Sequence, residues 1–175
     1  DPVDYENIPW RNGKFVDVAL EDALAVEDRA ANALAQLNTR GGDRALAFCA
    51  SIRHADFMCA YFNKHGVTAL AVHSGSNGTN RVEAIDALKR GSVRVVVTVD
   101  MFNEGVDIPQ VNTILMLRPT ESKIVWLQQI GRGLRVSDGK DRLTIIDYVG
   151  NHRAFLRSVE LMFGNIPKDF DEFVD

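Results

Sequence analysis

Two arginines and a glutamine in the second half of the chain are spaced to bind a polyanion together. Ser122 can cap a helix that runs toward Gly131. If the helical turn continues beyond that glycine, Gln128, Arg132 and Arg135 fall at positions i, i+4 and i+7 on one face. Two guanidinium groups and an amide on one face form a donor array suited to a triphosphate. The alternative is a surface helix with solvated arginines, although glycines in this stretch weaken a purely structural helix.

Two acidic residues and a glycine follow the β-branched run at 93–99. In Glu104-Gly105-Val106-Asp107, the glycine lets the backbone approach a ligand closely, and Asp107 can accept hydrogen bonds from a sugar hydroxyl. Glu104, Gly105 and Asp107 are therefore candidates for nucleotide contact. Taken alone, this short pattern is more typical of a turn with solvated acids.

Polar residues also follow two apolar runs earlier in the chain. Ser51 comes directly after the run at 45–50, and His73 and Gly75 come after the run at 68–72. A hydroxyl, an imidazole and backbone N–H groups at strand ends and helix starts suit phosphate oxygens. Each of these residues alone is more often a helix cap or part of a turn.

The segments that must position these residues alternate between short apolar runs and helical stretches. Helical spacing is found at 53–65 and 80–90, and a glycine closes each segment. Apolar runs buried on both faces that alternate with helices indicate parallel strands joined by right-handed crossovers. The sequence therefore predicts an α/β fold with a parallel sheet of about five strands, whose functional loops lie at the carboxyl ends of the strands. The predicted strands are 45–50, 68–72, 93–99, 113–117 and 143–148.

The residues before this pattern have a different character. Residues 5–15 contain a proline and an Asn-Gly pair, which predict an extended arm or a hairpin. Residues 17–37 are rich in Ala, Leu and Glu at near-helical spacing and precede two glycines, so one or two helices are expected there.

Composition places the chain among ordinary globular domains. Of its 175 residues, 46% are apolar and 25% are charged, which excludes collagen, coiled coil and wholesale disorder and fits one domain. No apolar stretch approaches the roughly 18 residues of a membrane span, and no signal sequence opens the chain. Neither Cys49 and Cys59 nor the four histidines have metal-ligand spacing. We interpret the cysteines as buried or idle thiols in a reducing compartment and expect a cytoplasmic protein.

The net charge of −4 at pH 7 argues by itself against a nucleic-acid partner. Residues 118–157 nevertheless hold eight basic and four acidic side chains, whereas both ends of the chain are acidic. This block is therefore a candidate for polyanion binding, and an ordinary solvated face is the equally weighted alternative.

The order and spacing of these segments resemble the carboxy-terminal RecA-like lobe of superfamily 2 helicases and translocases, over about residues 44–148. Residues 48–51 resemble motif IV, residues 98–109 motif V, and residues 128–135, with the pattern Gln-x-x-Gly-Arg-x-x-Arg, motif VI. The wider stretch 117–148 most resembles the restriction-type, DEAD/DEAH-related branch of bacterial DNA helicases. The resemblance implies a three-layer RecA-like domain with a parallel sheet of about five or six strands.

The resemblance also implies roles for residues at the nucleotide. In the family, both motif VI arginines reach across the cleft between two lobes toward the γ-phosphate. Arg132 and Arg135 thus inherit the role of arginine fingers, which commonly accelerate phosphoryl transfer about 10³-fold or more. Gln128 would lie near the same nucleotide. Gly105 and Asp107 match motif V positions that approach it, with Asp107 as the ribose contact.

Nucleic acid is the second ligand that the resemblance implies. Ser51, the segment from His73 to Gly75, and Thr98 match positions that follow the nucleic-acid backbone in the family. Motif VI opens here with Gln-Gln rather than the His-Arg of DEAD-box RNA helicases, which favours DNA over RNA.

Half of the implied active site is missing from the sequence. Motors of this class use Gly-x-x-x-x-Gly-Lys-Ser/Thr for phosphates and an acidic pair for Mg²⁺, and neither Gly13-Lys14 nor Gly139-Lys140 has the first glycine or the hydroxyl. We expect an N-terminal RecA-like lobe of the same polypeptide to hold most of the ATP and Mg²⁺, and this chain alone to be inactive. The chain begins at Asp1 and its first methionine is Met58, as expected for a piece of a longer protein, although removal of a tag or of the initiator methionine would give the same start.

On this interpretation, residues 1–42 are an inter-lobe connector and helical lead-in, 43–163 the C-terminal lobe and 164–175 an acidic tail. Two alternatives stay open. One is a non-catalytic module that binds nucleic acid or protein, against which the intact Arg132 and Arg135 argue. The other is a self-contained nucleotide-binding α/β enzyme, against which the absent phosphate loop argues.

Overall fold

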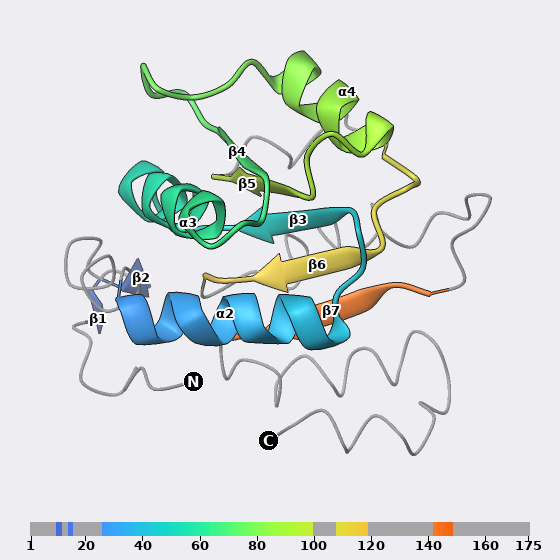
Figure 1. Cartoon of the computed structure of the whole chain (residues 1–175). Coiled ribbons are helices and arrows are strands. Elements are labelled where there is room, and N and C mark those ends of the chain that lie inside the picture. Colours follow the sequence, from blue (N-terminus) through green and yellow to red (C-terminus); the bar gives the residue numbers. More distant parts are fainter. Residues whose placement is uncertain (1–9, 12–13, 16–25, 100–107, 119–141, 149–175) are drawn as a thin grey trace, which may run out of the picture.

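In the part of the chain that the structure describes, five strands form a central parallel β-sheet (Figure 1). The computed structural model describes residues 10–11, 14–15, 26–99, 108–118 and 142–148. Within these ranges the strand order is β4-β5-β3-β6-β7, and every neighbouring pair is parallel. The strands are β3 (Ala45–Phe48), β4 (Ala69–Val72), β5 (Val95–Thr98), β6 (Thr113–Met116) and β7 (Thr144–Asp147). Each lies inside a run that the sequence predicts, so the α/β class with a parallel sheet is confirmed.

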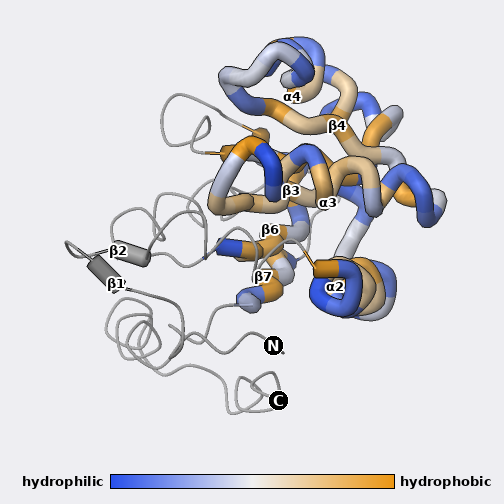
Figure 2. Tube along the Cα trace, turned by 90° about the vertical axis from the view of Figure 1, so that its left-hand side faces the viewer, coloured by the Kyte–Doolittle hydropathy of each residue, from blue (hydrophilic) through white to orange (hydrophobic). Residues whose placement is uncertain are grey.

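Helices cover both faces of this sheet and make three layers. Helices α2 (Glu27–Arg40) and α3 (Ile52–Lys64) pack on one face, and α4 (Arg81–Arg90) packs on the other. Figure 2 looks along the strands and shows apolar segments toward the inside of these layers. Alternate residues of β3 supply the two cores: Ala45 and Ala47 lie with α2 and α3, whereas Leu46 and Phe48 lie with α4. The continuous apolar runs thus reflect burial on both faces.

Local signals set the ends of α3 and α4. Ser51 and Asn80 cap their first turns, because each side chain accepts a hydrogen bond from a backbone N–H. At the other end of α4, Gly91 adopts φ 73°, a left-handed conformation that side chains disfavour. The predicted helices at 53–65 and 80–90 therefore agree with the structure to within one residue at each end.

Helix α2 shares the core of the sheet. Ala30, Ala33 and Leu37 are fully buried in the cluster that includes α3. The helix ends at Arg40, beyond the predicted end at 37. The prediction stopped early because the last three residues of the helix are polar and fall outside the apolar spacing. The earlier part of the predicted helical stretch, residues 17–25, lies outside the described residues.

The hairpin expected near the N-terminus is confirmed. Strands β1 (Trp10–Arg11) and β2 (Lys14–Phe15) pair antiparallel, with Trp10 opposite Phe15. The Asn-Gly pair between them matches the turn that such short connections favour.

Arg94 ties the amino edge of the sheet to the end of α2. Its Nε donates to the carbonyl of Gly42 at 3.0 Å, and Nη2 donates to the carbonyl of Leu37 at 3.0 Å. Nη1 donates to Oδ1 of Asn38 at 2.7 Å. One guanidinium therefore binds two backbone carbonyls and a side chain around the turn that leads from α2 into β3.

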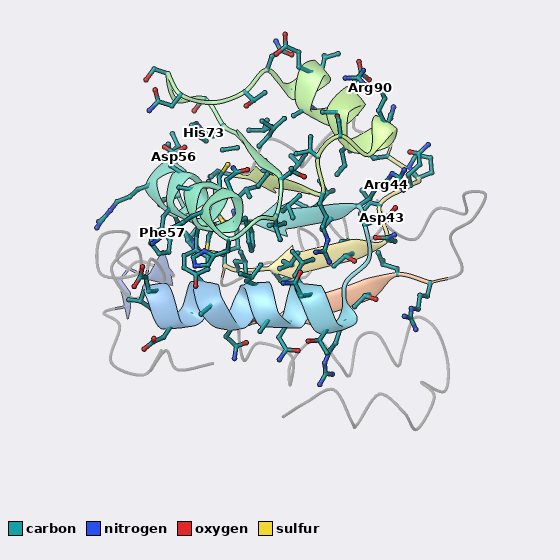
Figure 3. All side chains as sticks on the ribbon, in the orientation of Figure 1. Asp43, Arg44, Asp56, Phe57, His73 and Arg90 are labelled. Atoms are coloured by element: carbon teal, nitrogen blue, oxygen red, sulfur yellow. The ribbon has the colours of Figure 1, made fainter. Side chains whose placement is uncertain are left out.

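A second cluster lies on the same edge, where Figure 3 labels Asp43, Arg44 and Arg90. Asn112 donates to Asp43 at 2.7 Å, and Arg44 pairs with Asp43 at 2.7 Å. The hydrogen bond from Asn112, with the charge of Arg44, holds the pKa of Asp43 below its ordinary value. This edge is thus stabilised by polar contacts.

None of the helices in the described ranges is long and apolar enough to cross a membrane.

Candidate nucleic-acid interface

The carboxyl ends of all five strands lie at one edge of the sheet, because the strands are parallel. Figure 1 shows the arrowheads of β3 and β6 pointing to this edge. The candidate residues predicted from the sequence lie at or just after the carboxyl ends of β3, β4 and β5. Ser51, His73 and Thr98 therefore come to the same side of the molecule.

Ser51 is the N-cap of α3. Its Oγ accepts a hydrogen bond from the backbone N–H of His54 at 3.1 Å, as expected of a serine at this position. The next two residues, Ile52 and Arg53, are exposed. The capping role occupies one acceptor position of the hydroxyl and leaves its proton available to a ligand at the helix start.

His73 is buried at the same edge and uses both ring nitrogens inside the fold. Its side chain is 1% exposed, and Nε2 lies 2.8 Å from Oδ1 of Asp56 on α3. Nδ1 accepts a hydrogen bond from the backbone N–H of Gly75 at 3.1 Å. Because Nδ1 accepts, the ring proton lies on Nε2 and faces Asp56. Any effect of His73 on a ligand therefore passes through the loop that follows it, residues 74–79.

This 74–79 loop packs closely around His73. A Cβ added to Gly78 would lie 2.4 Å from the carbonyl oxygen of His73, a distance that real contacts do not reach. A Cβ added to Gly75 would lie 3.0 Å from the Nδ1 of His73 and 3.3 Å from a methyl carbon of Ile52. Gly78 is thus required by close approach to the backbone, whereas a side chain at Gly75 would require His73 or Ile52 to shift by a few tenths of an ångström.

The outer side of the 74–79 loop is polar. The N–H of Thr79 donates to the carbonyl of Ala71 at 2.7 Å and returns the chain toward β4. Between these anchors three side chains with hydroxyl or amide groups are exposed: Ser74, Ser76 and Asn77. The loop therefore presents hydrogen-bond donors at the carboxyl edge, which suits contacts to phosphate and sugar.

Thr98 ends β5 and is fully buried. Its carbonyl accepts a hydrogen bond from the N–H of Cys49 at 2.9 Å. Its Oγ1 is buried and has no hydrogen-bond partner among the described residues. A buried hydroxyl without a partner is costly, and because Thr98 is fully buried, a ligand could reach this atom only if neighbouring residues moved.

A buried arginine, which sequence reasoning did not select, holds α2 against this edge. Arg29 is 1% exposed; its Nη2 donates to the carbonyl of Leu117 at 3.3 Å, and its guanidinium lies 5.7 Å from the centre of the Tyr148 ring. The Tyr148 hydroxyl donates to Asn32 at 2.7 Å, and burial raises the pKa of Tyr148 to about 12. The ends of β6 and β7 are thus linked to α2.

His54 lies under the same edge without a charge. Its Nδ1 accepts a hydrogen bond from the N–H of Ala50 at 3.4 Å. Burial, assisted by the positive charge of Arg29, lowers the pKa of His54 to about 3. Burial likewise raises the pKa of the Cys49 thiol well above its ordinary value. These two groups are therefore neutral at physiological pH, and both cysteines are free thiols.

The residues predicted to contact the nucleotide lie outside the described residues. These are Glu104, Gly105, Asp107, Gln128, Arg132 and Arg135. Within the ranges that the structure describes, no group of three or more His, Cys, Asp or Glu side chains could hold a metal ion. The described part of the site is thus the part expected to face nucleic acid.

Residues 29–137 match the family described as the helicase conserved C-terminal domain. The chain belongs to this family. The match begins within α2 and includes strands β3 to β6. This finding confirms the sequence-based identification of a C-terminal RecA-like lobe of a superfamily 2 helicase.

Two curated relatives carry the names of an ATP-dependent helicase and of a UvrABC system protein. The chain is 33% identical over 130 residues to the putative ATP-dependent helicase IRC3 of Saccharomyces cerevisiae, covering 74% of this chain and 19% of the relative. It is 34% identical over 113 residues to UvrABC system protein B of Kosmotoga olearia, covering 59% and 17%. The helicase C-terminal domain described here thus spans about a fifth of the length of these relatives.

Solved structures share the fold. The C-terminal domain of the DEAD-box protein Dbp5 superposes with a TM-score of 0.64 at 20% identity, covering 81% of this chain and 82% of that domain. The E. coli DEAD-box protein SrmB, solved with the regulator RraA, gives a TM-score of 0.59 at 23% identity, with 79% of each chain covered. The three-layer RecA-like architecture predicted for this helicase domain is therefore confirmed.

Proposed function

We propose that this helicase C-terminal domain is the second motor lobe of an ATP-dependent DNA helicase or translocase. The observation that carries the proposal is the family match over residues 29–137. It includes the three loops at the carboxyl edge and the candidate arginine fingers. The name of the yeast relative, an ATP-dependent helicase, supports a motor as the parent protein.

At the nucleotide, we assign Arg132 and Arg135 to the γ-phosphate and Gln128 to a position beside it. Two guanidinium groups stabilise the charge that develops on the transferred phosphoryl group. Glu104, Gly105 and Asp107 supply the contacts to the rest of the nucleotide, with Asp107 at the ribose. The β- and γ-phosphates and Mg²⁺ are held by an N-terminal lobe, because this sequence lacks a phosphate loop.

Along the nucleic acid, the carboxyl edge supplies the contacts. We assign the hydroxyls of Ser51 and Thr98 and the backbone of Gly75 to the sugar–phosphate chain, since polar groups of this kind position a strand without reading its sequence. His73 acts from behind the 74–79 loop. The Gln-Gln opening of motif VI supports DNA over RNA.

ATP in the cleft would attract both arginines and close the two lobes, and hydrolysis would let them separate. Because both lobes also hold the nucleic-acid strand, each closure moves the protein along it. The lobe described here completes a site and is inactive alone.

The test is ATP hydrolysis by this chain and by the polypeptide extended through the preceding lobe, each with single-stranded DNA, duplex DNA or RNA. We expect hydrolysis by the extended protein only, stimulated by DNA. Arg132→Ala should lower kcat about 10³-fold while DNA affinity stays unchanged. Arg90→Ala is the matched control, because Arg90 is exposed in the last turn of α4 and lies outside the basic block at 118–157.

Three results would contradict the proposal. A wild-type rate of hydrolysis by Arg132→Ala would show that Arg132 is not an arginine finger. Hydrolysis by the isolated chain would require that the chain has a phosphate-binding loop of its own. Absence of hydrolysis in the extended protein, with DNA binding retained, would favour the alternative of a non-catalytic binding module. Stimulation by RNA alone would overturn the assignment to DNA.

A further inference from the structure

We propose that Asp56 is a positioning residue that holds the 74–79 loop, through His73, in the shape that contacts the nucleic-acid backbone. The inference rests on the function proposed above and adds to it a residue from α3. No motif singles out Asp56, which lies 17 positions from His73 in the sequence. The link between them exists only in the folded chain.

A continuous chain of hydrogen bonds connects the carboxylate to the loop. Oδ1 of Asp56 accepts from Nε2 of His73 at 2.8 Å, and Nδ1 of the same ring accepts from the N–H of Gly75 at 3.1 Å. Figure 3 shows Asp56 and His73 beside each other near the start of α3. Because an imidazole with one proton has one donor and one acceptor, the partner of Nε2 determines which nitrogen can accept. Asp56 thereby fixes Nδ1 as the acceptor for Gly75.

The tautomer matters because His73 has no freedom to adapt. Its side chain is 1% exposed, and Gly75 and Gly78 enclose it so closely that added methyl groups would contact its ring or its backbone. If the proton moved to Nδ1, two N–H groups would face each other at 3.1 Å. The loop would have to move away from the ring, and its exposed polar groups would move with it.

The location of Asp56 also favours a positioning role over that of an ordinary exposed acidic residue. A carboxylate beside a nucleic-acid track repels phosphate, so an acidic side chain there weakens binding unless it acts through the protein. The Asp56 side chain is 41% exposed, whereas its partner is buried. The partly exposed carboxylate of Asp56 thus orients a buried imidazole, and that imidazole binds the backbone of the 74–79 loop. This arrangement is expected if the ring transmits the orientation set by Asp56 to the loop.

The experiment compares Asp56→Ala and Asp56→Asn in this chain. Asparagine keeps an oxygen that accepts from Nε2 and removes the charge, whereas alanine removes both. Asp86→Ala is the matched control, because Asp86 is an exposed acid on helix α4, on the other face of the sheet. Three quantities are measured: the ¹⁵N shifts of the His73 ring, the exchange rate of the Gly75 amide, and affinity for a labelled DNA strand of about 12 nucleotides.

We expect Asp56→Ala to give a mixture of His73 tautomers, faster exchange of the Gly75 amide and about tenfold weaker DNA binding. Asp56→Asn should retain the wild-type tautomer and keep affinity within about threefold, since the hydrogen bond persists. Asp86→Ala should leave all three quantities unchanged.

An unchanged tautomer and unchanged Gly75 exchange in Asp56→Ala would overturn the proposal. So would equal losses in Asp56→Asn and Asp56→Ala, because charge rather than the hydrogen bond would then matter. Faster exchange throughout β3 and β5 would assign the pair to general stability and also overturn it. A wild-type chain that binds no DNA would count against the proposed function, while the tautomer and exchange measurements would still decide whether Asp56 holds the loop.

Discussion

Replacing Arg94 with alanine should destabilise the domain more than its half-buried position suggests. The side chain donates three hydrogen bonds, two of them to the carbonyls of Leu37 and Gly42. Both carbonyls belong to the turn that connects α2 to the central strand β3. Without the guanidinium, the Gly42 carbonyl loses this donor, and Leu37 keeps only the bond from the N–H of Gly41.

The magnitude follows from these contacts. A hydrogen bond in a folded protein contributes a net stabilisation of about 1 kcal/mol, and more when the donor is charged. The bonds to the two carbonyls are partly buried, whereas the bond to Asn38 is exposed, so its contribution is smaller. We therefore expect Arg94→Ala to lower the free energy of unfolding by about 2–3 kcal/mol, which for a domain of this size is about 5–10 °C in Tm.

Urea denaturation followed by circular dichroism measures this loss, with Arg94→Lys and Arg90→Ala as comparisons. Lysine keeps the charge but has no planar fork, so it should recover less than half of the loss. Arg90 is an exposed residue in the last turn of α4, and its replacement should change Tm by less than about 2 °C. A loss below about 1 kcal/mol in Arg94→Ala, or full recovery by lysine, would refute the reasoning.

Two further predictions concern buried groups at the carboxyl edge. Because the pKa of His54 is lowered to about 3 in the fold, the unfolded chain binds a proton there below about pH 6.5 and the folded chain does not. Stability should therefore fall by about 1.4 kcal/mol per pH unit as pH decreases from about 6 toward 4. In His54→Asn this slope should be shallower by that amount, and an equal slope in both proteins would show that His54 is not the cause. Thr98→Val should leave Tm unchanged or raise it, since Oγ1 has no partner among the described residues. The same variant should weaken DNA binding about threefold to tenfold, and a Tm lower by more than about 3 °C would mean that the hydroxyl serves the fold.

The strands were predictable because burial on both faces leaves a simple trace in the sequence. Val95, Val96 and Val97 are all fully buried, so no polar residue interrupts the run. The caps Ser51 and Asn80 and the left-handed Gly91 act on their immediate neighbours, and local effects of this kind are visible in sequence. The end of α2 was harder to predict, because its last turn is polar.

The contacts of the site were less predictable than its location. Strand ends indicate which loops share an edge, so the sequence alone is enough to group Ser51, His73 and Thr98. No local pattern indicates that Asp56 faces His73, since the pairing depends on how α3 lies across the sheet. The burial of Arg29 could not be predicted for a similar reason. An arginine in a first helical turn is ordinarily a surface residue, and only the packing of α2 buries it.

The strand order has a consequence for how the chain folds. β3 is the first strand of the large sheet to be synthesised, yet its two neighbours are β5 and β6. One of its hydrogen-bonding edges therefore remains open until β5 has left the ribosome, and the other until β6, as far as Met116, has done so. Contacts between such distant segments close large loops and slow folding. A nascent chain that stops before Val95 has an apolar central strand with no partner, and this is the stage at which the domain is most open to aggregation and to capture by chaperones.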